Sequence, residues 1–371
     1  MYLYKLPWSQ QDNPNGWIEP TTYCQLKCPG CYRGLDTWEV IFQHIPLDEM
    51  KQQVDDFIAK RNVQTISIAW GEPLMYPQIF DLVEYISSKK IFTKIYTNGI
   101  SLTEKTLQRM KEVWLTEFVV HIDMFQDRQG WIGKTETELN ILRQSFVDMF
   151  RKYPWINLGF IMPIGTNNLI YLDDIMKFYR TNIDIINLIV FTVFRDVHVD
   201  NLATIDAKML AEEIAKRVEY EPSSYLPKVR RQDEYAWLLS VGFGNPSNYF
   251  GDVNAKQYQW FMEAYYKKWW KFFITKRHVL MKGLNLCKLF AGILFSKSGI
   301  KIIKNYLFSK EKKFYYQSIL IIDPPSKFGD WCEACPDMMY VNGKMFPSCM
   351  VNKYKPFKDR FLKKKKDVSH S

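Results

Sequence analysis

The feature that most constrains the fold of this chain is a regular alternation of short apolar runs with longer segments of helical periodicity, which continues to about residue 200. The apolar runs have the length and β-branched composition of buried strands, and the segments between them repeat at the spacing of amphipathic helices. The expected strands are 17–20, 64–70, 92–97, 117–123, 156–163 and 186–192, and the expected helices are 47–60, 78–89, 103–113, 135–151 and 169–179. Such an alternation predicts an α/β fold with a parallel sheet and crossover helices.

Three cysteines follow the first expected strand in a C-x3-C-x2-C arrangement: Cys24, Cys28 and Cys31. Three thiolates can hold three corners of a cubic iron–sulfur cluster and leave one iron open to another ligand. Zinc is the alternative, although a closed zinc site needs a fourth ligand and the nearest histidine, His44, lies thirteen residues beyond Cys31. Structural disulfides are disfavoured, because residues 1–11 lack the apolar stretch of a secretion signal. Seven cysteines in 371 residues therefore indicate a reducing cytosol.

Two later strands run directly into turn-forming or polar residues. The two runs are Gly71-Glu72-Pro73 and Thr97-Asn98-Gly99. Read alone, the second is a plain strand-ending turn, because Asn-Gly is a common turn dipeptide. In order after the cysteine loop, the two runs resemble the motifs of the radical S-adenosylmethionine (SAM) superfamily. One departure is Trp70, which stands where the family's Gly-Gly-Glu-Pro segment has its first glycine.

The resemblance implies both the fold and the cofactors. The fold would be an open (β/α)6 TIM-like barrel over residues 14–205, and Cys24, Cys28 and Cys31 would bind a [4Fe-4S] cluster whose open iron chelates SAM. The residues expected to contact SAM are Gly71, Glu72, Pro73, Thr97, Asn98 and Tyr32. The family often carries an aromatic residue beside the third cysteine. Tyr32 is therefore expected to pack against the adenine, and Gly30, before Cys31, is a departure from the family's pattern.

His121 and Asp123 end the fourth expected strand. At the carboxyl end of a barrel strand they would face the active-site mouth, where they could orient substrate, touch the SAM ribose or move a proton. The alternative for His121 is a core position with one satisfied hydrogen bond. Both residues are predicted here as catalytic, beside a polar loop at 126–129.

A second group of cysteines lies near the C-terminus: Cys332, Cys335 and Cys349. A Val-Asn-Gly-Lys turn between two β-like stretches predicts a hairpin that presents three thiolates to one metal site. This region resembles the shortened auxiliary-cluster domains, SPASM or twitch, that follow many radical SAM barrels, so a second iron–sulfur cluster is expected. Structural zinc is the rival. The fourth ligand stays open, with Cys287 the one cysteine left, and a lone cysteine on an apolar helix is more often a core residue than a ligand.

The segment from 256 to 320 is strongly basic and aromatic. The segment contains fourteen Lys and Arg and two Glu, a net charge of +12. Because the whole chain has a net charge of only +10, the excess of positive charge lies in this segment. Its longest apolar run contains Lys288 and is shorter than the roughly 20 residues that span a bilayer. One reading is an interfacial helix drawn to anionic lipid, aided by the 363–366 lysine tail. The other is a helical cap packed on the barrel. Nucleic-acid binding is disfavoured, because the patch is more aliphatic than a nucleic-acid face.

Together these features predict four units. They are the barrel at 14–205, a helical, basic and aromatic connector at 206–320 with an irregular stretch at 221–255, an auxiliary metal domain at 321–355 and a basic tail at 356–371. The family resemblance implies reductive cleavage of SAM to a 5′-deoxyadenosyl radical, which takes hydrogen from a peptide, a protein or an apolar, lipid-like substrate. The electron would come from a donor such as flavodoxin or ferredoxin. The expected location is the cytoplasm, with or without contact to the inner membrane face. The alternative function is a non-catalytic zinc or iron–sulfur module that binds nucleic acid or a membrane surface.

Overall fold

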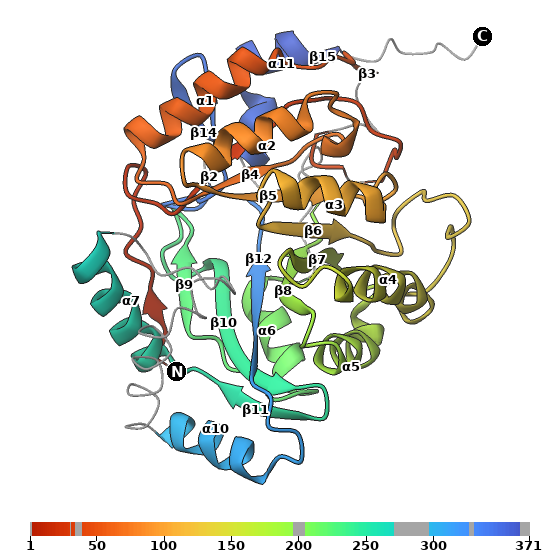
Figure 1. Cartoon of the computed structure of the whole chain (residues 1–371). Helices are drawn as coiled ribbons and strands as arrows, with labels where there is room; N and C mark the ends of the chain where they lie inside the picture. The colour runs from red at the N-terminus through yellow and green to blue at the C-terminus, as the bar shows by residue number, and fades with distance from the viewer. Residues whose placement is uncertain are drawn as a thin grey trace.

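The computed structural model describes residues 2–29, 31–33, 39–195, 205–270, 297–325 and 330–363. Six parallel strands alternate with helices, as predicted (Figure 1). The strands are β2 (Asn15–Ile18), β4 (Thr65–Ile68), β5 (Phe92–Thr97), β6 (Glu117–His121), β7 (Asn157–Ile164) and β8 (Ile186–Val193). The helices are α1 (Leu47–Lys60), α2 (Ile79–Ser88), α3 (Glu104–Glu112), α4 (Glu136–Arg151) and α5 (Leu172–Thr181), with 3₁₀ turns η1 (Pro73–Met75) and η2 (Leu169–Tyr171). Neighbouring strands pair in parallel from β2 to β8, so the alternating α/β prediction is confirmed.

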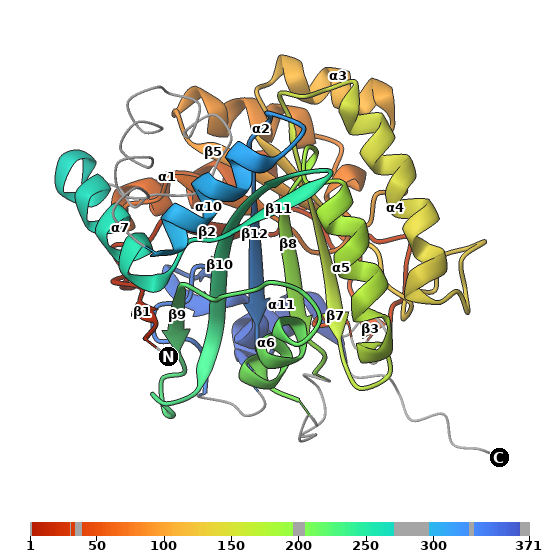
Figure 2. The same ribbon diagram turned by 90° about the horizontal axis from the view of Figure 1, so that it is seen from below.

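Helix α4 begins where the sequence supplies a cap. Thr135 Oγ1 accepts from the Glu138 N–H at 3.3 Å, and the Glu138 carboxylate accepts from the Thr135 N–H at 2.9 Å. This reciprocal capping box satisfies two backbone donors at the start of α4. Helices α2 to α5 follow one another around the outer face of the sheet (Figure 2).

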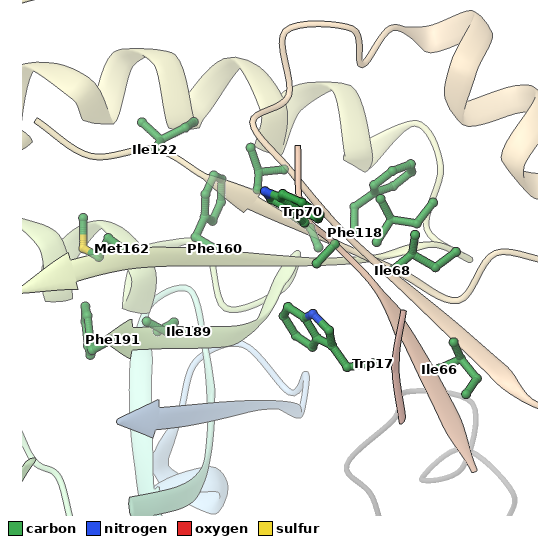
Figure 3. Packing of buried hydrophobic residues seen from close by; sticks show 14 of the residues in the cluster. Trp17, Ile66, Ile68, Trp70, Phe118, Ile122, Phe160, Met162, Ile189 and Phe191 are labelled. Atoms are coloured by element: carbon green, nitrogen blue, oxygen red, sulfur yellow. The ribbon is translucent and has the colours of Figure 1, made fainter. Parts of the chain in front are cut away.

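The main core lies between the sheet and these helices. Phe118, Ile122 and Phe160 pack there, all 1% exposed or less (Figure 3). Trp17 on β2 belongs to the same cluster but also lines the cavity at the strand ends. Successive side chains along a strand point to opposite faces of the sheet. The outer face therefore buries apolar side chains against the helices, and the inner face is left to build a site.

The sheet does not end at β8. Strand β12 (Tyr315–Ile322) pairs with β8 in parallel, and β10 (Tyr235–Asn245) pairs with β12 in antiparallel orientation (Figure 1). Further strands are β9 (Ser224–Pro227), β11 (Asn248–Asp252) and β1 (Tyr4–Lys5), which place β1 at the far edge of one 11-stranded sheet.

The prediction of an irregular connector at 221–255 is therefore wrong, and the helical region predicted for 206–320 is only partly helical. The glycines that suggested turns lie inside β10. At Gly242 a Cβ atom would come within 1.6 Å of the Tyr249 hydroxyl oxygen, so glycine is required by a side chain that crosses the strand. The helices in this region are α6 (Ala207–Ala215), α7 (Ala255–Trp269) and α10 (Lys297–Phe308).

Helix α7 carries part of the basic, aromatic segment. Its apolar side chains Tyr258, Phe261 and Met262 are buried in a second core cluster with β1, β9 and β10, which is the arrangement of a packed cap. The most aliphatic part of the segment, residues 271–296 with Cys287 and Lys288, lies outside the described residues. Among the described helices, none combines the length and the hydropathy needed to cross a bilayer.

The predicted C-terminal hairpin is present. Strands β13 (Met338–Val341) and β14 (Lys344–Pro347) pair through Asn342 and Gly343, whose φ angles of +50° and +74° match the type I′ turn that Asn-Gly favours. A 3₁₀ segment η3 (Ser348–Lys353) and helix α11 (Lys355–Phe361) follow. Strand β15 (Leu362–Lys363) then pairs with β3 (Glu39–Val40), so the beginning of the predicted basic tail is folded onto the body, and residues 364–371 lie outside the described part.

Candidate functional site

The carboxyl ends of the parallel strands surround a cavity of about 310 Å³. Its walls are largely aromatic or aliphatic. The apolar lining includes Trp17, Leu26, Tyr32, Trp70, Tyr96, Phe125, Ile161, Phe194 and Ile322. Of the residues predicted for the site, those that line the cavity are Cys24, Cys28, Cys31, Tyr32, Gly71, Thr97, Asn98, His121, Asp123 and Cys349. The structure therefore brings the first cysteine group and Cys349 to one space, whereas Cys332 and Cys335 do not line it.

The N-terminal cysteines lie in the loop after β2. The Leu26 N–H donates to Cys24 Sγ at 3.4 Å, and Asn98 Nδ2 donates to the same sulfur at 3.8 Å. Burial raises the pKa of the Cys24 thiol to about 11, and burial, with nearby Asp123 and the other two thiols, raises the pKa of Cys28 further above its ordinary value. Iron deprotonates a bound thiol outright, so metal binding would remove this penalty.

The donor set and the space beside it fit an iron–sulfur cluster. A cubic cluster takes one thiolate at each of three separate corners, and Cys24, Cys28 and Cys31 all border the same cavity. The N–H groups of Leu26 and Asn98 already point to one of the sulfurs, as donors do around cluster ligands. Within the described ranges, no three His, Cys, Asp or Glu side chains form a group that could hold a single metal ion.

Trp70 and Gly71 adopt left-handed backbone angles in succession, with φ of +62° and +54°. A left-handed conformation costs a non-glycine residue roughly 1–2 kcal/mol. The strain at Trp70 is offset by packing, because its buried ring lies 5.6 Å from the ring of Phe357 and 5.3 Å from that of Phe361. Trp70, which stands where the family has a glycine, thus anchors α11 to the end of β4.

Glu72 and Pro73 do not line the cavity. The fully buried Glu72 carboxylate accepts from Thr97 Oγ1 at 2.6 Å, from the Asn98 N–H at 2.7 Å and from the Leu74 N–H at 3.0 Å. Burial raises its pKa in spite of these bonds. Glu72 therefore joins the ends of β4 and β5, and this leaves Gly71, Thr97 and Asn98 as the residues of the two motifs at the cavity wall.

His121 and Asp123 face the cavity together. His121 Nε2 lies 2.5 Å from Asp123 Oδ2, close enough for an ion pair when the imidazole is protonated, and Asp123 Oδ1 accepts from the Phe125 N–H at 2.7 Å. The loop that follows closes this corner. Buried Arg128 donates to the carbonyl oxygens of Asn98 and His121, and thereby joins the ends of β5 and β6.

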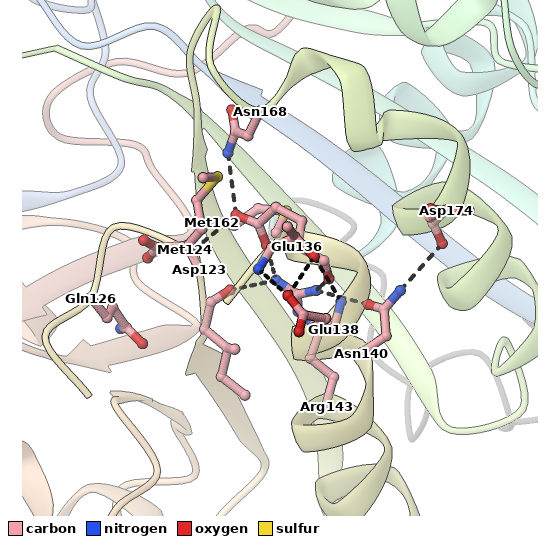
Figure 4. Close-up of polar contacts among 12 residues, drawn as sticks. Asp123, Met124, Gln126, Glu136, Glu138, Asn140, Arg143, Met162, Asn168 and Asp174 are labelled. Atoms are coloured by element: carbon pink, nitrogen blue, oxygen red, sulfur yellow. Dashed lines mark hydrogen bonds and ion pairs between the residues drawn. The ribbon is translucent and has the colours of Figure 1, made fainter. Parts of the chain in front are cut away.

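A buried ion pair holds the same loop from behind (Figure 4). Arg143 and Glu136 on α4 are both fully buried and bonded to each other, and Arg143 Nη2 also donates to the Ile122 carbonyl at 2.9 Å. Glu136 Oε1 accepts from the Met124 N–H at 3.0 Å and from Asn168 Nδ2 at 3.3 Å. Both neighbours of Asp123 in the chain are therefore fixed by this pair.

Replacing Arg143 by methionine is expected to lower the free energy of unfolding by about 3–5 kcal/mol, because Glu136 would stay buried without its counter-ion. Chemical denaturation measures the change. The matched control is Lys134→Met, which breaks the exposed Lys134–Glu138 pair on the same helix entrance and should change stability little. Equal effects of the two substitutions would contradict the role given to the buried pair.

The C-terminal cysteines meet at the open edge of the barrel. Cys332 and Cys335 are buried, their thiols are in hydrogen-bond contact, and Cys349 is close enough to act on the pKa of Cys332. The contact with Cys335 and burial raise the pKa of Cys332 well above its usual range. Asn13 Nδ2 donates to the Ala334 carbonyl at 3.1 Å and fixes this knuckle against the strand that precedes the first cysteine loop.

One arginine connects the two cysteine groups. Arg33, two residues after Cys31, is fully buried and pairs with Glu19. Its Nη1 donates to the Ser348 carbonyl at 2.5 Å and to Asn352 Oδ1 at 3.2 Å, on either side of Cys349. Sequence reasoning missed Arg33, because Ser348 and Asn352 lie more than 300 residues away.

Two further residues that line the cavity, Asp337 and Arg195, were not among the predicted site residues. Asp337 lines the cavity beside Cys349, accepts from Asn15 Nδ2 at 3.0 Å, and has its pKa raised to about 6 by burial. Its place two residues after Cys335 was the available signal. Arg195 at the end of β8 lines the opposite wall and pairs at 2.6 Å with Asp323, which follows β12.

Known proteins resemble parts of this chain. An "AdoMet-dependent heme synthase" of Methanosarcina barkeri is 26% identical over 135 residues, 34% of this chain and 38% of that protein. The "antilisterial bacteriocin subtilosin biosynthesis protein AlbA" of Bacillus subtilis is 24% identical over 135 residues, 34% of this chain and 29% of that protein. The chain therefore spans only about a third of the length of these relatives. The structure of Streptococcus suis SuiB bound to S-adenosylmethionine is 18% identical with a TM-score of 0.43, over 57% of this chain and 47% of that one.

The family comparison covers the segment that holds the six-stranded barrel and the first cysteine group. Residues 18–198 match the radical SAM superfamily, whose motifs were expected at Cys24, Cys28, Cys31 and Gly71. This segment of the chain belongs to the radical SAM superfamily.

Proposed function

We propose that the chain is a radical SAM enzyme that removes hydrogen from a peptide or protein substrate. When bound, a [4Fe-4S] cluster on Cys24, Cys28 and Cys31 would supply the electron that splits SAM and so generates the radical that takes the hydrogen. The observation that carries the proposal is the convergence of these three cysteines, Gly71 and Asp123 on one largely apolar cavity at the strand ends.

The chain's own residues would position the reactants and keep water away. The apolar walls formed by residues such as Trp17, Phe125 and Phe194 exclude solvent from the reacting atoms. Asp123 and His121 can hold or move a proton at the wall, through the 2.5 Å contact between Nε2 and Oδ2. Arg195, which is paired with Asp323, lines the same cavity at the end of β8.

The C-terminal cysteines are proposed to hold a second iron–sulfur cluster, in a domain of the SPASM or twitch type. The donor set is Cys332, Cys335 and Cys349, and the last of these borders the cavity. Cys349 is the thiol of this group that a bound substrate could approach.

The peptide assignment is supported by two observations. The Bacillus subtilis relative is named for bacteriocin biosynthesis. The cavity is lined by aromatic and aliphatic side chains, which suit an apolar or aromatic residue of a peptide. A lipid-like substrate fits the same walls and is the competing outcome. The electron donor is proposed to be a flavodoxin or ferredoxin, which dithionite can replace in an assay.

The activity is tested by anaerobic reconstitution with iron and sulfide, followed by chromatography for 5′-deoxyadenosine after SAM and dithionite are added. The expected result is a brown protein with about eight iron atoms per chain, two cubes of four, that forms the product. A protein that stays colourless and binds zinc at both cysteine groups would overturn the proposal in favour of a non-catalytic metal-binding module.

The substrate class is tested with deuterated extracts. Cells grown in heavy water provide a peptide fraction and a lipid fraction, and each is incubated with the reconstituted protein and unlabelled SAM. Mass spectrometry of the 5′-deoxyadenosine then shows which fraction donates deuterium. Deuterium from the peptide fraction is expected. Deuterium from lipids alone, with salt-sensitive sedimentation on anionic liposomes, would instead show the lipid-like substrate and membrane contact.

A further inference from the structure

Three arginines are fully buried in the described part of this protein, and one of them differs from the other two. Arg33 pairs with the carboxylate of Glu19, and Arg143 pairs with the carboxylate of Glu136. Arg61 is 1% exposed and forms no ion pair with a carboxylate in the described residues. A guanidinium stays protonated in proteins, so Arg61 brings an uncompensated positive charge into the interior.

Arg61 lies directly after α1, at the edge of the barrel that faces the C-terminal cysteine knuckle. Its Nη2 donates to the Cys335 carbonyl oxygen at 2.5 Å, while Nε and Nη1 have no partner among the residues that the structure describes. Burial lowers the pKa of Arg61 to about 10, opposed first by Cys335 and then by Asp337 and Tyr340. The residue that Arg61 contacts is therefore a cysteine of the second metal site.

A buried cation without a partner costs several kcal/mol, and unmade hydrogen bonds of its N–H groups add to that cost. Asp337 acts on the pKa of Arg61 from nearby, but no hydrogen bond or ion pair joins the two side chains in the described residues, and Asp337 Oδ1 accepts from Asn15. Three thiolates around a metal cluster carry net negative charge, and cluster sulfurs accept N–H hydrogen bonds that set the reduction potential. A charged cluster at Cys332, Cys335 and Cys349 would thus supply the missing counter-ion.

We propose that Arg61 is a positioning residue of the C-terminal cluster, whose charge and free N–H groups stabilise the cluster and raise its reduction potential. The inference rests on the proposed cluster at Cys332, Cys335 and Cys349. Arg61 acts there through the Cys335 knuckle, and it plays no part in binding SAM. Of the three buried arginines, it is the one whose counter-ion would be the bound cluster.

The test uses the full chain in a Cys28→Ala background, which leaves the C-terminal cluster as the one to be observed. Arg61→Met removes the charge at similar length, Arg61→Lys keeps the charge, and Lys60→Met alters the exposed neighbour, which pairs with Asp56. Each protein is reconstituted anaerobically, its iron is counted, and the midpoint potential is measured by electron paramagnetic resonance during a redox titration.

The expected result for Arg61→Met is a reduction equilibrium shifted at least tenfold toward the oxidised cluster, about 59 mV for one electron. Arg61→Lys should recover part of the shift and Lys60→Met should cause none. Iron lost from Arg61→Met but kept by Arg61→Lys, with unchanged circular dichroism, also supports the proposal. A potential and iron content equal to those of Lys60→Met would overturn it, as would loss of iron from both Arg61 variants together with loss of the fold.

The failure of the proposed cluster would look different. If the Cys28→Ala protein with Arg61 intact binds only zinc or no metal, the C-terminal iron–sulfur site itself is refuted before any Arg61 variant is compared.

Discussion

Replacing Cys28 by alanine should abolish 5′-deoxyadenosine formation and reduce the iron content from about eight to about four atoms per chain. Cys28 lies between Cys24 and Cys31 in the loop that borders the cavity. Two remaining thiolates hold a cube at too few corners, so no electron can reach SAM. Iron analysis and chromatography of the reaction mixture measure both effects.

The reciprocal control is Cys349→Ala, which should remove the other four iron atoms and leave the visible absorption of the first cluster. Together the two variants assign each half of the iron to its cysteine group. Product formation by Cys28→Ala at the wild-type rate would show that the cavity cysteines do not hold the cluster that cleaves SAM.

Substitution of Gly71 by alanine should disrupt the first cysteine loop almost as severely as loss of a cysteine. A Cβ atom at Gly71 would lie 2.3 Å from the Tyr23 carbonyl oxygen and 2.8 Å from that of Thr21, and both are backbone atoms that cannot rotate away. The Glu72 N–H also bonds to the Tyr23 carbonyl. The added methyl would therefore push the strand end and the loop apart, and we expect loss of the first cluster's iron and of activity.

Gly130→Ala provides a matched control for this substitution. Gly130 has φ of +79°, so alanine pays a similar left-handed penalty of roughly 1–2 kcal/mol, but nothing lies within 4 Å of its Cβ position. Its iron content should be that of the wild type. If Gly71→Ala also keeps full iron and activity, the close packing between Gly71 and the cysteine loop does not matter for cluster binding.

Local pattern was enough to predict the barrel. Each of the six parallel strands β2, β4, β5, β6, β7 and β8 carries its own apolar signal. Each pairs with the next of the six along the chain, so the order of pairing follows from the order of the chain. The hairpin around Asn342 and Gly343 was predictable for the same reason. Strand β10 was missed because glycines such as Gly242 suggest a turn. In the structure Gly242 lies inside the strand, where it leaves room for the side chain of Tyr249.

The site was predictable only in part. Motif residues such as Cys24 and Asp123 stand at strand ends, where the fold itself places them. Arg33 and Arg61 act through carbonyl groups that lie 315 and 274 residues away, and no local pattern announces such a partner. Glu72 is the opposite case. Its motif is visible in the sequence, but its carboxylate accepts hydrogen bonds from Thr97 and Asn98 inside the protein and does not line the cavity.

The extension of the sheet has a consequence for how the chain is made. Strand β8 ends at Val193, and its partner β12 begins only at Tyr315. While the ribosome synthesises the intervening residues, the edge of β8 exposes unpaired N–H and carbonyl groups on a strand whose side chains are almost all apolar. A nascent or truncated chain that stops before β12 therefore offers a template for aggregation, and both Cys349 and the far wall of the cavity arrive last. Metal loading of the second cysteine group can therefore begin only once Cys349 has been synthesised, after every strand of the large sheet.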